Sequence, residues 1–221
     1  MIRLTKVSKC FAQHGPAAHA LCSVDLQIEQ GEFVAVTGAS AAGKTTLLNI
    51  IGLIDTPSSG HYVFEGSDLR NCSDAELTEL RKRRIGFLFQ GFRLIEDLTV
   101  GENVELPLRY QRCPRHRRKL ATRELLELIG LDAQAHAYPD ELSPGEQQCV
   151  AIARAVVHDP ALLLADEPLG DIDEESAARI LDMLSTLHAV GTTVLMATHS
   201  PASAARADRI VTLRNGHIVS D

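Results

Sequence analysis

The sequence predicts an α/β fold with a mainly parallel sheet that carries helices on both faces. Apolar runs at Phe33–Val36 and Ala161–Asp166 have the length and composition of buried strands. Residues 44–54 and 143–158 have the apolar spacing and the end signals of helices. Because strands that alternate with helices pair in parallel, these segments indicate one layered core, which continues in a strand at Thr192–Thr198.

Both ends of the chain predict antiparallel strands. Residues 2–7 and 21–28 alternate without a helical period, and a Gly- and Pro-containing stretch at residues 13–18 predicts a turn between them. Near the other end, Ile210–Leu213 and His217–Ser220 flank an Asn-Gly pair, which predicts a hairpin.

The middle of the chain predicts an inserted helical subdomain at residues 90–142. The pattern there changes to helices joined by loops, and one helix begins at a capping box, Thr99–Glu102. We expect a single domain over residues 1–221, whose core is formed by residues 1–89 and 143–221.

The segment from Gly38 to Thr46 reads Gly-Ala-Ser-Ala-Ala-Gly-Lys-Thr-Thr and joins a predicted strand to a predicted helix. This arrangement aims backbone N–H groups and the positive end of the helix at one point, where a polyphosphate binds. The lysine supplies a mobile cation and the first threonine a hydroxyl for Mg²⁺, whereas the alternative is a plain glycine turn. The sequence therefore predicts a P-loop NTPase core, with the triphosphate bound by Gly38, Ala39, Ser40, Ala41, Ala42, Gly43, Lys44, Thr45 and Thr46.

Further polar residues follow other predicted strands. Asp166 and Glu167 end one apolar strand, and His199 follows another. Because ligands of parallel α/β sheets bind at the carboxyl ends of the strands, we expect these side chains to face the phosphates. Asp166 would then hold Mg²⁺, Glu167 would act on the attacking water, and His199 would bind the γ-phosphate or that water. Gln90, after the strand at residues 85–89, is placed to bind Mg²⁺ or the water.

Composition excludes several other classes of protein. The net charge of −7 argues against a protein that mainly grips nucleic acid. The 5 cysteines are scattered without a Cys-x-x-Cys pair, and the 9 histidines show no metal-binding spacing, so we expect neither disulfides nor a histidine metal site. No segment has the length and apolarity of a signal peptide or a membrane span, so we expect a soluble chain in a reducing cytosol.

One basic run, Arg112–Lys119, opposes the acidic balance of the chain. It fits the solvated start of a helix, and the sharper alternative is a patch for membrane headgroups or a partner protein.

The motifs, in this order, resemble the ATP-binding subunit of ABC transporters over essentially the whole chain. The deciding segment is Leu142–Gln148, Leu-Ser-Pro-Gly-Glu-Gln-Gln, which resembles the signature motif of that family at the start of a helix. The resemblance implies an ATPase in which Gln90, Asp166, Glu167 and His199 serve the Mg²⁺ and the attacking water. It also places Phe11 where the family stacks an aromatic ring on adenine, with an ordinary strand-end residue as the alternative.

The same resemblance implies partners. Two such subunits would close head to tail on Mg-ATP, so that Ser143, Gly145 and Glu146 of one copy meet the phosphates held by the other. The homodimer, or a pair with a similar ATPase subunit, would drive separate integral membrane permease subunits from the cytoplasmic face of the inner (plasma) membrane. Nucleic acid is not expected as a partner.

Several positions and the branch of the family stay open. Ala41 stands where a loop glycine is usual, Pro144 replaces the first signature glycine, and Cys149 replaces an arginine. Parts of the chain resemble lipoprotein-release and macrolide-export ATPases, whereas Phe89–Leu94 and Val194–His199 resemble a cell-division branch without cargo. A DNA-repair ATPase of the same family is disfavoured, because the region between Gln90 and Leu142 is too short for a coiled-coil insertion.

Overall fold

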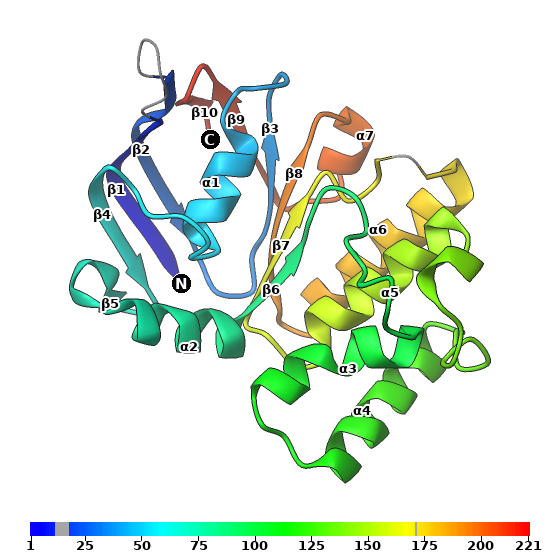
Figure 1. The fold of residues 1–221 in the computed structure, drawn as a ribbon. Coiled ribbons are helices and arrows are strands. Elements are labelled where there is room, and N and C mark those ends of the chain that lie inside the picture. Colours follow the sequence, from blue (N-terminus) through cyan, green and yellow to red (C-terminus); the bar gives the residue numbers. More distant parts are fainter. Residues whose placement is uncertain (12–17, 171) are drawn as a thin grey trace.

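The computed structural model describes residues 1–11, 18–170 and 172–221, which form two sheets with helices packed on them (Figure 1). The predicted turn at residues 13–18 lies outside the described residues except for its last position.

The larger sheet has six strands in the order β10-β9-β3-β8-β7-β6. Four of its five strand pairings are parallel, and the β9–β10 hairpin at one edge is antiparallel. The mainly parallel sheet predicted from the sequence is therefore confirmed. The strands are β3 (Phe33–Thr37), β6 (Ile85–Leu88), β7 (Leu162–Asp166), β8 (Thr193–Thr198), β9 (Arg209–Arg214) and β10 (His217–Ser220).

The smaller sheet is antiparallel and has the order β2-β1-β4-β5. Its first two strands are longer than the sequence pattern predicts, because their pairing extends past the alternating segments to Phe11 and Ala18. The strands are β1 (Ile2–Phe11), β2 (Ala18–Ile28), β4 (Ser59–Phe64) and β5 (Ser67–Asp68).

Helices cover both faces of the larger sheet. On one face, α1 packs between the two sheets, and its apolar residues share a core with both. On the opposite face, α3, α5 and α6 enclose a second core (Figure 1). The helices are α1 (Lys44–Ile51), α2 (Asp74–Arg84), α3 (Val100–Tyr110), α4 (Arg115–Leu128), α5 (Pro144–Val156), α6 (Glu174–Ala189) and α7 (Pro201–Ala204), with 3-10 turns at Leu69–Asn71 and Pro139–Glu141.

Helix starts follow the local sequence closely. In each of three capping boxes, a hydroxyl accepts the N–H of the third helical residue, whose carboxylate accepts the N–H of the capping residue. The end of α1 is different, because it stops at Ile51 and Gly52 rather than at Ile54 as expected. The three boxes pair Ser73 with Glu76, Thr99 with Glu102, and Ser143 with Glu146.

Within the described residues, no helix is both long enough and apolar enough to span a bilayer.

Gly86 tests the close packing of β6 on α5. A Cβ at this position would collide with the carbonyl oxygen of Ala155. We expect Gly86→Ala to lower the free energy of unfolding by about 1–3 kcal/mol, measured by urea denaturation.

The matched control is Gly170→Ala, where the nearest atom to a new Cβ is the Glu167 carbonyl oxygen at 3.6 Å. That variant should change stability by no more than about 0.5 kcal/mol. Equal losses in the two variants would contradict the packing argument.

Candidate functional site

The loop between β3 and α1 has a backbone that only glycine fits at two points. Gly38 and Gly43 have φ angles of 152° and 109°. A Cβ at Gly38 would collide with the carbonyl oxygen of Leu213, and one at Gly43 with that of Ala20. Gly43 caps α1 without a side-chain hydrogen bond, so the first N–H groups of the helix remain free for an anion.

Ala41 in the same loop has a φ of 60°, in the left-handed region. The usual glycine would adopt this angle without strain, whereas the Cβ of alanine costs about 1 kcal/mol. Ala41 nevertheless adopts the left-handed conformation, and the strain is located at the exposed tip of the loop.

The terminal hairpin supports the loop from behind. The N–H of Gly216, in the turn between β9 and β10, donates to the carbonyl oxygen of Ala42 at 3.0 Å. The carbonyl oxygen of Gly216 accepts from the N–H of Cys22 at 2.8 Å. The loop is therefore held between the smaller sheet and the β9–β10 hairpin.

Lys44 lies folded over this loop, 8% exposed. Its Nζ donates to the carbonyl oxygens of Gly38 at 2.9 Å and Ala39 at 3.3 Å, and lies 3.4 Å from Oε1 of Glu167. Lys44 therefore lies beside the carboxylate that follows β7. A phosphate oxygen is the kind of acceptor that this mobile ammonium group would exchange for the carbonyls.

Asp166 ends β7 and is 3% exposed. Its Oδ1 is buried with no hydrogen-bond partner. Burial raises the pKa of Asp166, and the nearby Thr45 hydroxyl opposes that rise. A buried carboxylate oxygen with a free lone pair beside a hydroxyl is a donor set that suits Mg²⁺, so these residues fit the expected ion. Among the described residues there is no cluster of three or more His, Cys, Asp or Glu side chains able to bind a metal.

Glu167 joins the two strand ends to the lysine. It leaves the strand with a φ of 47°, a left-handed angle that is uncommon for a residue other than glycine. Its Oε2 lies 2.9 Å from Nδ1 of His199, and its Oε1 contacts Lys44. Strain of this kind in a non-glycine residue is common where function needs a fixed side-chain direction. His199 itself is 77% exposed on its side chain, open to a ligand.

The residues of the signature segment lie at the start of α5. Ser143 caps the helix, with its Oγ donating to Oε2 of Glu146 at 2.7 Å. Pro144 occupies the first helical position, which tolerates proline because its N–H would be unpaired there. Gly145 is buried against Ser176, where a Cβ would collide. This end of the helix presents the exposed Ser143 and Pro144 to solvent.

Two further predicted residues stand apart from the Lys44–Glu167–His199 contacts. Gln90 is exposed and follows β6, which is the strand adjacent to β7 in the sheet. Phe11 ends β1, 38% exposed, with the Lys9 ammonium 5.1 Å from its ring centre. An accessible ring at a strand end is compatible with stacking on a base.

Sequence reasoning missed two polar residues of α5 that hold the loops of the site. Nε2 of the buried Gln148 donates to the carbonyl oxygen of Pro168 at 2.6 Å, directly after Glu167. Arg154 donates to the carbonyl oxygens of Arg93 at 2.7 Å and Phe92 at 3.1 Å, just after Gln90. Polar residues on the apolar face of a predicted helix were the available signal, but nothing local shows their partners.

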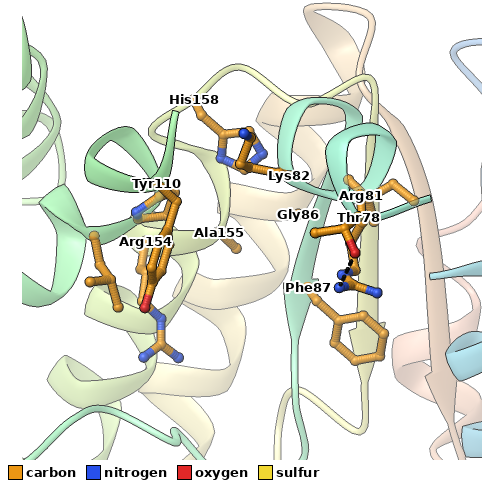
Figure 2. A pocket seen from close by; sticks show the side chains of 12 residues that line it. Thr78, Arg81, Lys82, Gly86, Phe87, Tyr110, Arg154, Ala155 and His158 are labelled. Atoms are coloured by element: carbon orange, nitrogen blue, oxygen red, sulfur yellow. Dashed lines mark hydrogen bonds between the residues drawn. The ribbon is translucent and has the colours of Figure 1, made fainter. Parts of the chain in front are cut away.

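A cavity of about 490 Å³ lies beside Arg154, lined by residues of α2, β6, α3 and α5 (Figure 2). Its lining includes the apolar side chains of Phe87 and Leu106 and the 64%-exposed Tyr110. Arg81 adds positive charge to the rim, where it hydrogen-bonds Thr78.

Comparison with known proteins decides the family. Residues 21–170 match the family described as ABC transporter. This chain belongs to the ABC transporter family. The resemblance inferred from the signature segment is thereby confirmed.

Named relatives match over the full chain. The chain is 43% identical to a macrolide export ATP-binding/permease protein, MacB 1/2, of Paracoccus denitrificans, covering 100% of this chain and 33% of that protein. It is also 43% identical to an uncharacterised ABC transporter ATP-binding protein, YknY, of Bacillus subtilis, covering 99% of this chain and 95% of that one. The chain thus spans 33% of the first relative and nearly all of the second.

Solved structures of similar proteins also belong to ABC cassettes. A dimeric, post-hydrolysis state of an ATP-binding cassette bound to ADP and Pi has a TM-score of 0.93 and 37% identity, covering 100% of this chain and 97% of that one. A dimeric bacterial ABC transporter cassette has a TM-score of 0.93 and 38% identity with the same coverage. The chain is an ATPase cassette of the ABC family, with the P-loop fold predicted from its sequence.

Asp166 generates a prediction about stability and pH. Its folded pKa is raised by burial, so the ionised carboxylate opposes folding at neutral pH. We expect Asp166→Asn to raise the free energy of unfolding at neutral pH, measured by urea denaturation without nucleotide. The gain should shrink as pH falls through the raised pKa toward the ordinary value of 3.8, because both states are then protonated.

The exposed carboxylate of Asp140 provides the control. Asp140→Asn should leave this pH dependence unchanged. A loss of stability in Asp166→Asn at neutral pH would contradict the assignment of burial as the dominant cause.

Proposed function

We propose that the cassette hydrolyses Mg-ATP at the Lys44–Glu167–His199 site. The observation that carries this proposal is the Glu167 carboxylate, which contacts Nζ of Lys44 at 3.4 Å and Nδ1 of His199 at 2.9 Å. One carboxylate is thereby held between the cation that binds the phosphates and an exposed imidazole. Such a carboxylate can orient a water molecule and accept its proton in line with the terminal phosphate.

The remaining roles follow from placement. The loop N–H groups and Lys44 bind the phosphates, while the hydroxyl of Thr45, Oδ1 of Asp166 and the amide of Gln90 hold Mg²⁺. When bound, Mg²⁺ neutralises charge on the phosphate oxygens. His199 fixes the direction of Glu167 and donates to the γ-phosphate, and Phe11 stacks on the adenine ring.

The second proposal is a dimer closed by ATP. Solved relatives with the same fold are dimeric, which supports association of two copies or of two similar ATPase subunits. The start of α5 carries Ser143, the N–H of Gly145 and the positive end of the helix dipole, so it suits the phosphates held by a second copy. Glu146 contributes by fixing Ser143 through the capping box.

We further propose that this dimer drives membrane permease subunits at the cytoplasmic face of the inner (plasma) membrane. Relatives named as export ATP-binding/permease proteins support the pairing, because there a permease shares the chain with a cassette like this one. The cavity beside Arg154 (Figure 2) is the docking surface we favour. Arg154 borders the cavity and hydrogen-bonds the backbone that follows Gln90. A partner docked in the cavity would therefore be connected to Gln90 through Arg154.

The class of cargo distinguishes two versions of this function. The macrolide-export names of several relatives favour an efflux or release system over a cell-division regulator without cargo. We therefore place the chain with export-type ATPases.

Glu167 supplies the test of hydrolysis. We expect Glu167→Gln to lower phosphate release at saturating Mg-ATP by about 10²–10⁴-fold, because the amide cannot accept a proton. Size-exclusion chromatography with ATP should show the variant trapped as a dimer. Glu174→Gln, at an exposed position in the first turn of α6, is the matched control and should retain wild-type turnover. Phosphate release by Glu167→Gln at the wild-type rate would contradict the proposal.

Tyr110 supplies the test of docking. Purification of the tagged chain from detergent-solubilised membranes should yield an integral subunit with several spanning helices. Tyr110→Glu should abolish that co-purification and leave the ATPase rate of the isolated cassette unchanged, because it places a charge at the docking surface alone. Leu120→Glu, at an exposed position of α4 outside the cavity, should retain the partner. Retention by both variants would place the docking surface elsewhere.

A further inference from the structure

Two reactive side chains lie in contact near the loop between β3 and α1, which is called the phosphate loop below. The ATPase chemistry uses neither of them. Sγ of Cys10 is 3.0 Å from Nδ1 of His19. The two residues are direct partners in the antiparallel pairing of β1 with β2. Cys10 is half-buried and His19 is exposed, so small molecules in solution have access to the pair.

The backbone around Cys10 is fixed from the other side of the strand. The N–H of Cys10 donates to Oγ of Ser58 at 3.1 Å. The neighbouring Lys9 donates through Nζ to Asp55 at 2.6 Å and to the carbonyl oxygen of Thr56 at 2.8 Å. The thiol is therefore held against the imidazole by a strand that is tied on both of its edges.

A thiol and an imidazole at this distance have the geometry of a nucleophile and its base. The thiolate is the reactive form of cysteine, and a nearby histidine can accept its proton. The other cysteines are Cys22, Cys72 and Cys113, which are half-buried, and Cys149, which is buried. In the part of the chain that the structure describes, none of them has an imidazole within hydrogen-bonding distance.

We propose that Cys10 is a redox-sensitive thiol, activated by His19 and oxidised by hydroperoxides. His19 accepts the thiol proton, and the sulfur attacks the terminal oxygen of the peroxide. An S–O bond forms as the O–O bond breaks, and the departing alkoxide, which is hydroxide in the case of hydrogen peroxide, takes the proton from the imidazolium and leaves as an alcohol or as water. Sulfur loses two electrons to the peroxide, and the product is a sulfenic acid.

The pair is positioned to pass this change to the nucleotide site. Ala20, next to His19, places its carbonyl oxygen where a Cβ at Gly43 would collide, so β2 packs directly on the phosphate loop. An oxygen atom added to Cys10 enlarges the side chain against His19 and displaces this part of β2. Oxidation should therefore weaken nucleotide binding, a regulatory effect that rests on the proposed ATP site.

Site-resolved labelling of the full chain tests the reactive thiol. The protein is treated with hydrogen peroxide, trapped with dimedone and analysed by peptide mass spectrometry. Because the neighbouring imidazole accepts the thiol proton, Cys10 should be labelled about tenfold or more faster than Cys22, Cys72 and Cys113. His19→Gln should reduce the rate at Cys10 to that of the other three while leaving theirs unchanged.

Nucleotide binding supplies the second measurement. Oxidation should raise the Kd for a fluorescent ATP analogue by about fivefold or more, the lower end of ordinary coupling between two sites. Cys10→Ser should bind the analogue as the reduced wild type does, with no response to peroxide.

The outcomes separate the two proposals. Equal labelling of all accessible cysteines, or no effect of His19→Gln, would overturn the reactive pair. Preferential labelling without a change in Kd would overturn the regulatory link. If the reduced protein failed to bind nucleotide, the ATP site would be wrong, whereas the labelling result would stand.

Discussion

The parallel register of three central strands is the constraint on which the site depends. Thr37 at the end of β3 lies opposite Thr198 at the end of β8, and Asp166 at the end of β7 lies opposite Ala197. The chain leaves all three strands at the same level, so the residues that follow them meet at one edge of the sheet. The contacts between Lys44, Glu167 and His199 are a direct result of this alignment.

Helix α5 connects this edge to the rest of the molecule. One end of the helix carries the capping box of Ser143, and its buried face forms the second apolar core. Along its length, Gln148 holds the backbone after β7, and Arg154 holds the backbone after β6. Because a packed helix moves as a rigid unit, any shift of α5 reaches both loops and its own exposed start together.

Local sequence was enough to predict the parts that depend on local chemistry. The glycine loop, the capping boxes and the carboxylates at the strand end depend on residues close together in the chain. The partners of Gln148 and Arg154, the contact of Cys10 with His19, and the left-handed turn at Glu167 depend on packing between distant elements. No periodicity or spacing in one sequence specifies those pairings, so only the folded chain reveals them.

The phosphate loop is supported by the β9–β10 hairpin, which is synthesised long after the loop itself. Thr37 and Thr212, whose hydroxyl oxygens are 3.2 Å apart, are separated by 175 positions. The glycine loop therefore emerges from the ribosome well before the strand and turn that brace it. A nascent chain that has not yet reached β9 and β10 therefore lacks a braced phosphate loop, and the loop gains its support only after that hairpin has been synthesised.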